Sequence, residues 1–138
     1  MKLIHDHLWG ILTVWQEARG ESYEGKMAVA EVILRRTQQK YSSDGTIAGT
    51  CLQPLQFSGW NAKDPNRIKA AQVDSEDPMV LECELAFDIA LKGSNMSHGA
   101  LLYLNPSGFP PNGLPGWVAR CEEVAVIGRH HFYVPKEG

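Results

Sequence analysis

The sequence predicts an α+β fold, a mostly helical domain followed by a small antiparallel β-sheet or hairpin in the C-terminal half. Apolar residues recur at helical spacing in three segments of the first 93 residues. Near the C-terminus, β-prone runs flank a turn that contains glycine. Because 138 residues fit one compact domain, we expect a single domain over residues 1–138.

The first predicted helix runs to about Ala18, because apolar residues recur every three or four positions at Leu3, Ile4, Leu8, Ile11, Leu12 and Trp15. Gly20 follows, where a left-handed C-terminal cap is usual. The second helix begins after Ser22, which can cap it, and has Glu24 in its first turn. Its apolar residues cover most of its circumference, which predicts a buried helix.

A short helical turn is expected around Ile47–Leu52, followed by a loop over residues 54–66 whose aromatic side chains are available for exposure. Another helix begins at Asp77-Pro78, because aspartate is a common cap and proline is favoured at the first helical position. It ends at Gly93, and we expect its core face to be Leu81, Cys83, Leu85, Ile89 and Leu91.

The C-terminal third alternates strands and a loop. Residues 100–104 form a short β-prone run, and residues 105–117 form an irregular loop rich in proline and glycine. The runs Val124–Ile127 and His131–Val134 flank Gly128-Arg129-His130, which predicts a hairpin.

Composition excludes several classes of protein. The net charge of −3 disfavours a nucleic-acid binder, which would present a basic patch to phosphates. No run approaches 18 apolar residues, so we expect no membrane insertion. The N-terminal segment lacks the uninterrupted apolar core of a secretion signal, so we expect synthesis in the cytosol.

The cysteines and histidines indicate no metal site. The three cysteines include no CxxC pair and are interpreted as buried free thiols, with one disulfide as the alternative: Cys51, Cys83 and Cys121. The five histidines show no HxxxH or HExxH spacing, so we expect no metal and no cofactor. A nucleophilic cysteine that meets His98, His130 or His131 in space remains an alternative.

Glu17 is the leading candidate for catalysis. A carboxylate in the last turn of a helix, close to a tryptophan, has its charged form disfavoured, which raises its pKa and suits a general acid. Cleavage of a glycosidic bond is a common use of such a group. The alternative is a surface glutamate paired with Arg19 or Lys26. Glu21 and Glu24 are the nearest second carboxylates, but both fit capping or pairing roles, so a single-acid mechanism is also considered.

Aromatic and amide side chains gather in two predicted loops, at Gln53, Gln56, Phe57, Ser58, Trp60, Tyr103, Asn105 and Trp117. Such side chains suit a sugar polymer, because sugar rings stack on aromatic faces while their hydroxyl groups need donors and acceptors. The alternative is that Trp60 and Trp117 close the edges of the core.

Four segments, in order, resemble the SleB-type cell wall hydrolases, a family that includes spore-cortex-lytic enzymes and phage endolysins. TVWQEARGESYEGKMAVAEVILRR resembles the family's GEARGE-like element and buried helix, and QPLQFSGW its QPxQFS segment. GALLYLNP resembles its ALYYxNP strand, and VIGRHHFYV its IGxHxFY hairpin. The chain departs from the family at Gln16, where glycine is usual, and at Arg35, where asparagine is usual.

The resemblance implies a lysozyme-like domain that cleaves peptidoglycan glycan strands as a lytic transglycosylase. Glu17 matches the family's catalytic acid, the first glutamate of EARGE. It would protonate the oxygen between N-acetylmuramic acid and N-acetylglucosamine, then act as a base while the muramoyl 6-hydroxyl closes a 1,6-anhydro ring. The positions that match the motifs give the candidate substrate-binding residues Gln56, Ser58, Tyr103, Asn105, Trp117 and His130.

We therefore expect a monomer that binds peptidoglycan glycan strands and acts on the wall after release from the cytosol, as a phage-type endolysin. A germination enzyme is the alternative role. The alternative activities are a hydrolytic muramidase of the same fold, a non-catalytic wall-binding module, and a Cys–His amidase or peptidase.

Overall fold

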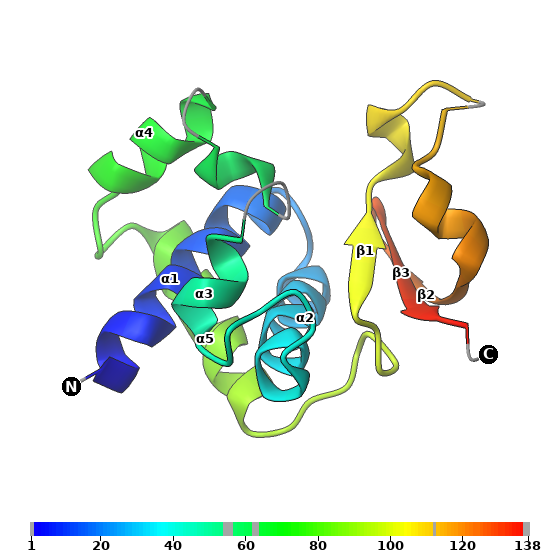
Figure 1. The fold of residues 1–138 in the computed structure, drawn as a ribbon. Helices are drawn as coiled ribbons and strands as arrows, with labels where there is room; N and C mark the ends of the chain where they lie inside the picture. The colour runs from blue at the N-terminus through cyan, green and yellow to red at the C-terminus, as the bar shows by residue number, and fades with distance from the viewer. Residues whose placement is uncertain (1, 54–56, 62–63, 112, 137–138) are drawn as a thin grey trace.

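In the computed structural model, helices occupy the first two thirds of the chain and a small sheet lies beside them (Figure 1). The structure describes residues 2–53, 57–61, 64–111 and 113–136, without the side chains of residues 2–5 and 58. The α-helices of this part are α1 (Lys2–Ala18), α2 (Tyr23–Gln39), α3 (Ile47–Cys51), α4 (Pro65–Gln72) and α5 (Pro78–Leu91). The strands are β1 (Leu102–Leu104), β2 (Cys121–Ile127) and β3 (His130–Pro135). Short 3-10 helices complete the description: η1 (Ser58–Trp60), η2 (Pro106–Gly108) and η3 (Gly116–Arg120).

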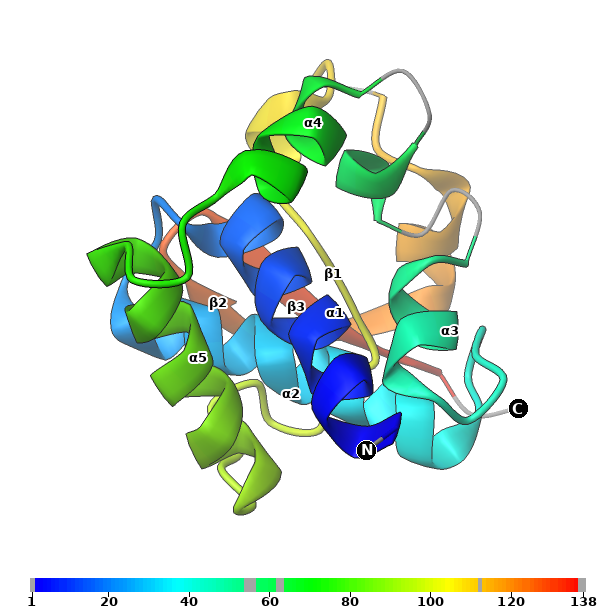
Figure 2. The ribbon, with the colours of Figure 1, turned by 90° about the vertical axis from the view of Figure 1, so that its left-hand side faces the viewer.

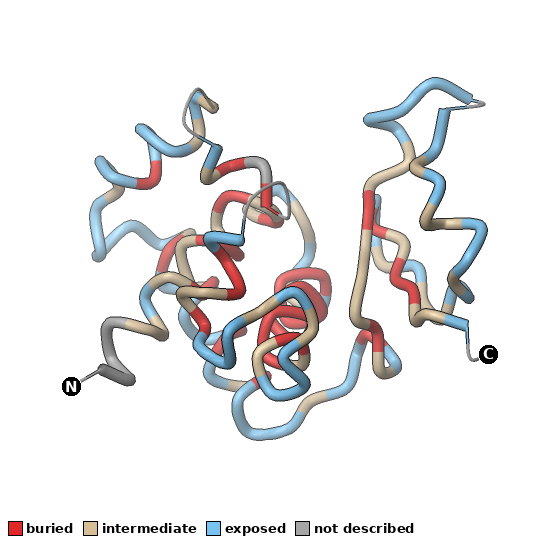
Figure 3. The backbone as a smooth tube through the Cα atoms, viewed as in Figure 1, coloured by how far each residue is buried: buried red, intermediate tan, exposed pale blue. Residues whose placement is uncertain are grey.

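The helix α2 lies at the centre of the molecule and packs against α1, α3, α5 and β1 (Figures 1 and 2). Most of its residues are buried, as Figure 3 shows, so the prediction of a buried second helix is confirmed. Small side chains such as Ala28 and Ala30 allow neighbouring helices to approach closely on two sides. Lys26 is buried as well, and its amine donates to the backbone carbonyl of Glu21 at 2.5 Å.

The sheet has the order β1-β3-β2, and both pairs are antiparallel. The predicted hairpin is confirmed, since Ile127 pairs with His130 across a turn at Gly128-Arg129. Side chains of a strand alternate between its faces, and Tyr103 lies opposite Phe132 in the register. Tyr103, His130 and Phe132 therefore share the face of the sheet that turns toward the helices.

The predicted helix boundaries hold at Ser22 and at Asp77. The Ser22 hydroxyl accepts the N–H of Gly25, and the Asp77 carboxylate accepts that of Met79. Gly93 adopts a positive φ of 109° after α5, as a C-terminal glycine should. Gly20 is different, because it is not in the left-handed region. A Cβ there would lie 3.0 Å from a guanidinium nitrogen of Arg129, so glycine leaves room for that side chain.

Two predictions about the helices are wrong. The predicted loop over residues 54–66 overlaps the start of α4, although Asp64-Pro65 repeats the Asp-Pro signal that begins α5. The core face of α5 is not its leucine face, since Leu81, Leu85 and Leu91 are exposed. The buried residues of α5 are Val80, Cys83, Ala86, Phe87 and Ala90, which lie on the side of α5 that packs against α1 and α2.

The loop prediction for residues 54–66 is also wrong in part, because Phe57 is 2% exposed and belongs to the core. Trp60 packs edge-on against Trp9 and donates its indole N–H to the Thr13 hydroxyl at 2.7 Å, so it closes the edge of the core. Within the described part of the chain, no helix has the length and apolar character needed to cross a membrane.

Candidate active site

A pocket of about 390 Å³ opens between the C-terminal end of α1 and the sheet. Its walls come from α1, α2, β1, η2 and β3, and the lining residues are Gln16, Glu17, Arg36, Phe57, Tyr103, Leu104, Asn105, Gly108, Phe109 and His130. The structure thus brings together four of the predicted site residues, namely Glu17, Tyr103, Asn105 and His130.

Glu17 lies in the last turn of α1, as the sequence predicts, and its Oε1 accepts the Tyr103 hydroxyl at 2.7 Å. Burial raises the pKa of the Glu17 carboxyl above its ordinary value of 4.5, and the charge of Asp64 adds to this. The Tyr103 hydrogen bond and the Arg36 guanidinium act in the opposite direction on this pKa. The net result is a carboxyl group that holds its proton more tightly than a free glutamic acid does, which suits a general acid.

The alternative of a surface ion pair for Glu17 is wrong, because both expected partners bind elsewhere. Arg19 donates to the carbonyls of Trp15 and Gln16 and to the side chain of Asn66, and its guanidinium lies 4.3 Å from the Trp15 ring. Lys26 binds the Glu21 carbonyl and forms an ion pair with Glu82 at 3.7 Å.

Tyr103 is held between aromatic rings. Its ring centroid lies 5.0 Å from that of His130, 5.7 Å from that of Phe132 and 6.4 Å from that of Phe57. Burial and the Glu17 charge raise the pKa of Tyr103 well above 10.0, so its hydroxyl stays protonated and donates to Glu17. Strand pairing sets this arrangement, since β1 and β3 place Tyr103 beside Phe132.

Arg36 is a site residue that sequence reasoning did not identify. It is 4% exposed, donates Nε–H to the Leu101 carbonyl at 2.6 Å, and lies 5.3 Å from the Phe57 ring. A cation at this place favours the ionised form of Glu17 after proton transfer.

His130 is 6% exposed, and its Nδ1 has no hydrogen-bond partner among the described residues. Burial lowers the pKa of His130, although the charge of Glu21 opposes this, so the neutral imidazole is favoured near pH 7. His131, the next residue along β3, points to the other side of the strand, and its ring contacts Glu123. His130 therefore offers a polar group to the pocket without a charge.

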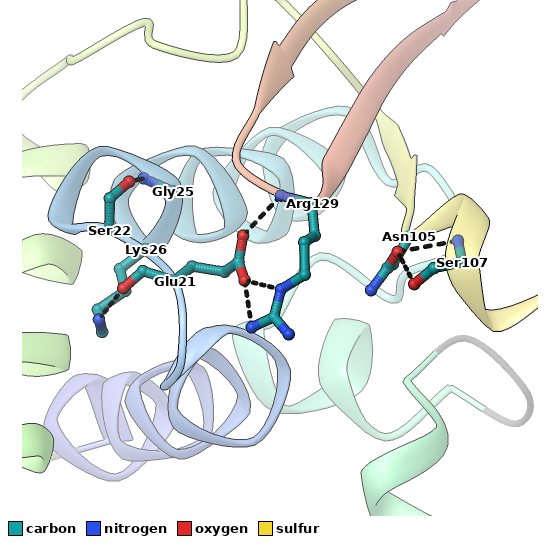
Figure 4. A network of polar contacts seen from close by, with 7 residues as sticks. All are labelled: Glu21, Ser22, Gly25, Lys26, Asn105, Ser107 and Arg129. Carbon is teal, nitrogen blue, oxygen red and sulfur yellow. Dashed lines mark hydrogen bonds and ion pairs between the residues drawn. The ribbon is translucent and has the colours of Figure 1, made fainter.

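Glu21 does not serve as a second carboxylate in the pocket. Its side chain is 6% exposed and binds the backbone N–H and the guanidinium of Arg129 (Figure 4). Burial opposes ionisation, but the hydrogen bonds from Arg129 lower the pKa of Glu21 overall. Glu21 therefore has a pairing role, and its partner is Arg129. Among the described residues that line the pocket, Glu17 is the one carboxylate.

Gln16 joins α1 to the segment above the pocket. Its amide donates to the carbonyls of Gly59 and Asn66, both at 3.2 Å. A Cβ on Gly59 would lie 2.3 Å from Gln16 Oε1, so the backbone approaches the amide closely there. A glycine at position 16, usual in the family that the sequence resembles, has no side chain to make this connection.

The remaining predicted site residues lie at the margin or outside the described part. Asn105 lines the pocket, but its Oδ1 caps η2 by accepting from the N–H and hydroxyl of Ser107 (Figure 4). Trp117 lines an adjoining pocket rather than that of Glu17. Gln56 lies outside the described residues, and for Ser58 only the backbone, in η1, is described.

The thiols differ from one another in burial. Cys51 and Cys83 are buried and free, as predicted, and burial raises their pKa values to about 12 and about 11. Cys121 is half-buried, so the prediction of burial is wrong for it. No cluster of three or more His, Cys, Asp or Glu residues suited to a metal ion occurs in the part of the chain that the structure describes.

A sequence profile described as "Cell Wall Hydrolase" matches residues 20–133. The chain belongs to the cell wall hydrolase family. Among curated members, the spore cortex-lytic enzyme of Oceanobacillus iheyensis is 34% identical over 119 residues, and that of Bacillus subtilis is 31% identical. These matches cover 86% of this chain but only 38% and 34% of the two relatives, so the chain spans little more than a third of their length.

Two solved structures resemble this cell wall hydrolase over 94% of its length. The catalytic domain of the germination-specific lytic transglycosylase SleB from Bacillus anthracis has a TM-score of 0.73, 26% identity and 93% of its own chain covered. The catalytic domain of the Bacillus cereus SleB protein has a TM-score of 0.74, 26% identity and 89% covered. The predicted family resemblance and the lysozyme-like α+β fold are confirmed. The matched profile begins after Glu17, so the role of this residue depends on its geometry.

Proposed function

We propose that this cell wall hydrolase cleaves peptidoglycan glycan strands as a lytic transglycosylase, with Glu17 as acid and then base. The observation that carries the proposal is the half-buried Glu17 carboxyl, which accepts a hydrogen bond from Tyr103 and faces a pocket beside the sheet. Relatives named spore cortex-lytic enzyme and SleB lytic transglycosylase support the substrate class and the reaction.

In the proposed reaction, protonated Glu17 donates its proton to the oxygen between N-acetylmuramic acid and N-acetylglucosamine. The bond from the muramoyl C1 to this oxygen breaks, and the oxygen leaves as a hydroxyl group. The Glu17 carboxylate then takes the proton of the muramoyl 6-hydroxyl. The oxygen of this hydroxyl bonds to C1 and closes the 1,6-anhydro ring. Arg36 and the Tyr103 hydroxyl stabilise the carboxylate between the two proton transfers.

Internal ring closure needs no second carboxylate, because the sugar itself supplies the nucleophile. Glycosidases that use two carboxyl groups need them about 5–9.5 Å apart across the bond that is cleaved. The engagement of Glu21 by Arg129 supports the single-acid route over a double displacement through Glu21. We assign Tyr103, Asn105 and His130 to the substrate pocket on the basis of their positions in its walls.

The decisive experiment compares the wild type with Glu17→Gln on purified murein, with product analysis by mass spectrometry. We expect the variant to fold and to lose about 10²–10⁴-fold in rate, and the wild type to release 1,6-anhydromuramoyl ends. Glu24→Gln, an exposed glutamate in the first turn of α2, is the matched control and should remain active.

Each other outcome identifies an alternative activity. Reducing muramic ends would indicate a hydrolytic muramidase, and binding to murein without soluble fragments would indicate a wall-binding module. Full activity of Glu17→Gln would remove Glu17 from the mechanism. We further propose a monomer with a phage-type endolysin role, to be tested by sedimentation and by whether expression together with a membrane-permeabilising protein lyses cells.

A further inference from the structure

A second pocket, of about 450 Å³, adjoins the pocket of Glu17. The two share the lining residues Arg36, Tyr103, Leu104 and Phe109, so they form one continuous groove across β1. The second pocket adds residues from beyond the end of α2 and from η3, principally Tyr41, Ser42, Pro115 and Trp117. The groove thus extends beyond the pocket that contains Glu17.

Tyr41 reaches this groove through an unusual backbone conformation. Lys40 and Ser42, its two neighbours, have φ angles of 54° and 47°, in the left-handed region. Residues other than glycine pay roughly 1–2 kcal/mol there, and such strain concentrates at functional sites. The N–H of Tyr41 donates to the Arg36 carbonyl at 2.9 Å, and the Arg36 guanidinium lies 6.0 Å from the Tyr41 ring. The α2 terminus therefore fixes an aromatic ring at the pocket.

Trp117, in η3, provides a second aromatic residue to this pocket. Its ring contacts Tyr133 edge to face, with centroids 5.4 Å apart and planes at 85°. Tyr133 is 5% exposed and lies in β3, so Trp117 is anchored on the sheet. Phe109, 38% exposed, completes the aromatic lining next to the Glu17 pocket.

We propose that the Tyr41–Trp117 pocket binds a further sugar ring of the same glycan strand, adjacent to the rings held at Glu17; this proposal rests on the proposed function. Aromatic faces match the apolar faces of pyranose rings. Arg36 is the one charged residue in the described lining, and its side chain is buried and bound to the Leu101 carbonyl. The pocket therefore suits a neutral sugar better than the acidic groups of a stem peptide.

The test compares Tyr41→Ala with Tyr41→Phe on peptide-free glycan strands of increasing length. A further sugar site makes kcat/KM rise with strand length until the pocket is filled. We expect Tyr41→Ala to lose about 5- to 10-fold on long strands, as for one aromatic contact, and to match the wild type on the shortest strand that is cleaved. Tyr41→Phe, which keeps the ring, should retain the length dependence. An equal loss at all lengths, or no loss at any length, would overturn the proposal.

A binding measurement separates this site from the proposed reaction. Calorimetry of long peptide-free strands with Glu17→Gln and with the double variant Glu17→Gln/Tyr41→Ala needs no turnover. Weaker binding by the double variant, about 5- to 10-fold, supports the sugar site even if the wild type proves inactive. Equal binding by the two variants refutes it, whatever the activity. Thermal unfolding of each variant tests whether substitution of the half-exposed Tyr41 leaves the fold intact.

Discussion

Arg129 binds the carboxylate of Glu21 twice, through its backbone N–H at 2.9 Å and through its guanidinium at 2.8 Å (Figure 4). Glu21 follows the end of α1, while Arg129 lies in the turn between β2 and β3. The next residue, His130, contacts Tyr103, which in turn binds Glu17. The end of α1 is therefore connected to the sheet at two places, through Glu21 and through Glu17. The ion pair between Glu21 and Arg129 holds the β2–β3 hairpin against α1, the helix that carries Glu17.

Arg129→Ala should lower the free energy of unfolding by about 1–3 kcal/mol, because it leaves a buried carboxylate with fewer donors. Arg67→Ala, an exposed arginine on α4, is the control and should have little effect. The pKa of Glu21 is lowered in the folded state, so its contribution is present above pH 4.5 and declines as the pH falls through its folded pKa. Urea titrations at several pH values should show the two proteins converging in acid. A constant difference would contradict this role.

Tyr103→Phe should shift the alkaline limb of the pH–rate profile of murein cleavage upward. The Tyr103 hydroxyl stabilises the Glu17 carboxylate, so its loss raises the pKa of Glu17 further and keeps the acid protonated at higher pH. The rate at the optimum should fall about tenfold, because the carboxyl loses the bond that orients it. Tyr23→Phe, on α2, is the matched control. If the rate falls but the alkaline limb of the pH–rate profile does not shift, Tyr103 contributes only through packing.

Glu17→Gln should increase stability at neutral pH, although it lowers the rate of the proposed reaction. The pKa of Glu17 is raised in the folded state, so the folded protein binds more protons than the unfolded one above pH 4.5. Wild-type stability therefore falls as the pH rises through this window, by about 1.4 kcal/mol for each unit of pKa difference. The amide does not ionise, so the two proteins should be equally stable well below pH 4.5 and should diverge above it. Thermal unfolding across pH measures this, and a variant less stable than the wild type at pH 7 would contradict it.

The sequence predicted those parts of the fold that local patterns determine. Ser22 and Asp77 cap helices by bonds within three residues of themselves, and the β2–β3 hairpin depends on a turn at Gly128. The position of Glu17 at a helix end also followed from periodicity. These features could be predicted because their physical causes lie within a few residues along the chain.

The missed features depend on contacts between distant segments. The leucines of α5 predicted the wrong face, because contacts with α1 and α2, which are distant in sequence, decide which side of α5 is buried. Glu21 and Arg129 are separated by 108 positions, and no local pattern indicates that they meet. Arg36 contacts Phe57 and the carbonyl of Leu101, the residue before β1, and both are distant from α2 in the sequence. Tertiary packing determines each of these features, and the periodicity of apolar residues along the chain does not predict tertiary packing.

Thiol alkylation of the native protein should modify Cys121 and spare the other two cysteines. Burial raises the pKa values of Cys51 and Cys83 to about 12 and about 11, so few thiolates form at neutral pH, and both side chains are inaccessible. Mass spectrometry after iodoacetamide treatment should therefore show one adduct in native buffer and three in denaturant. Murein cleavage should survive the treatment, because Glu17 rather than a thiol carries the proposed reaction. Loss of cleavage in step with labelling of Cys51 or Cys83 would instead favour the Cys–His alternative.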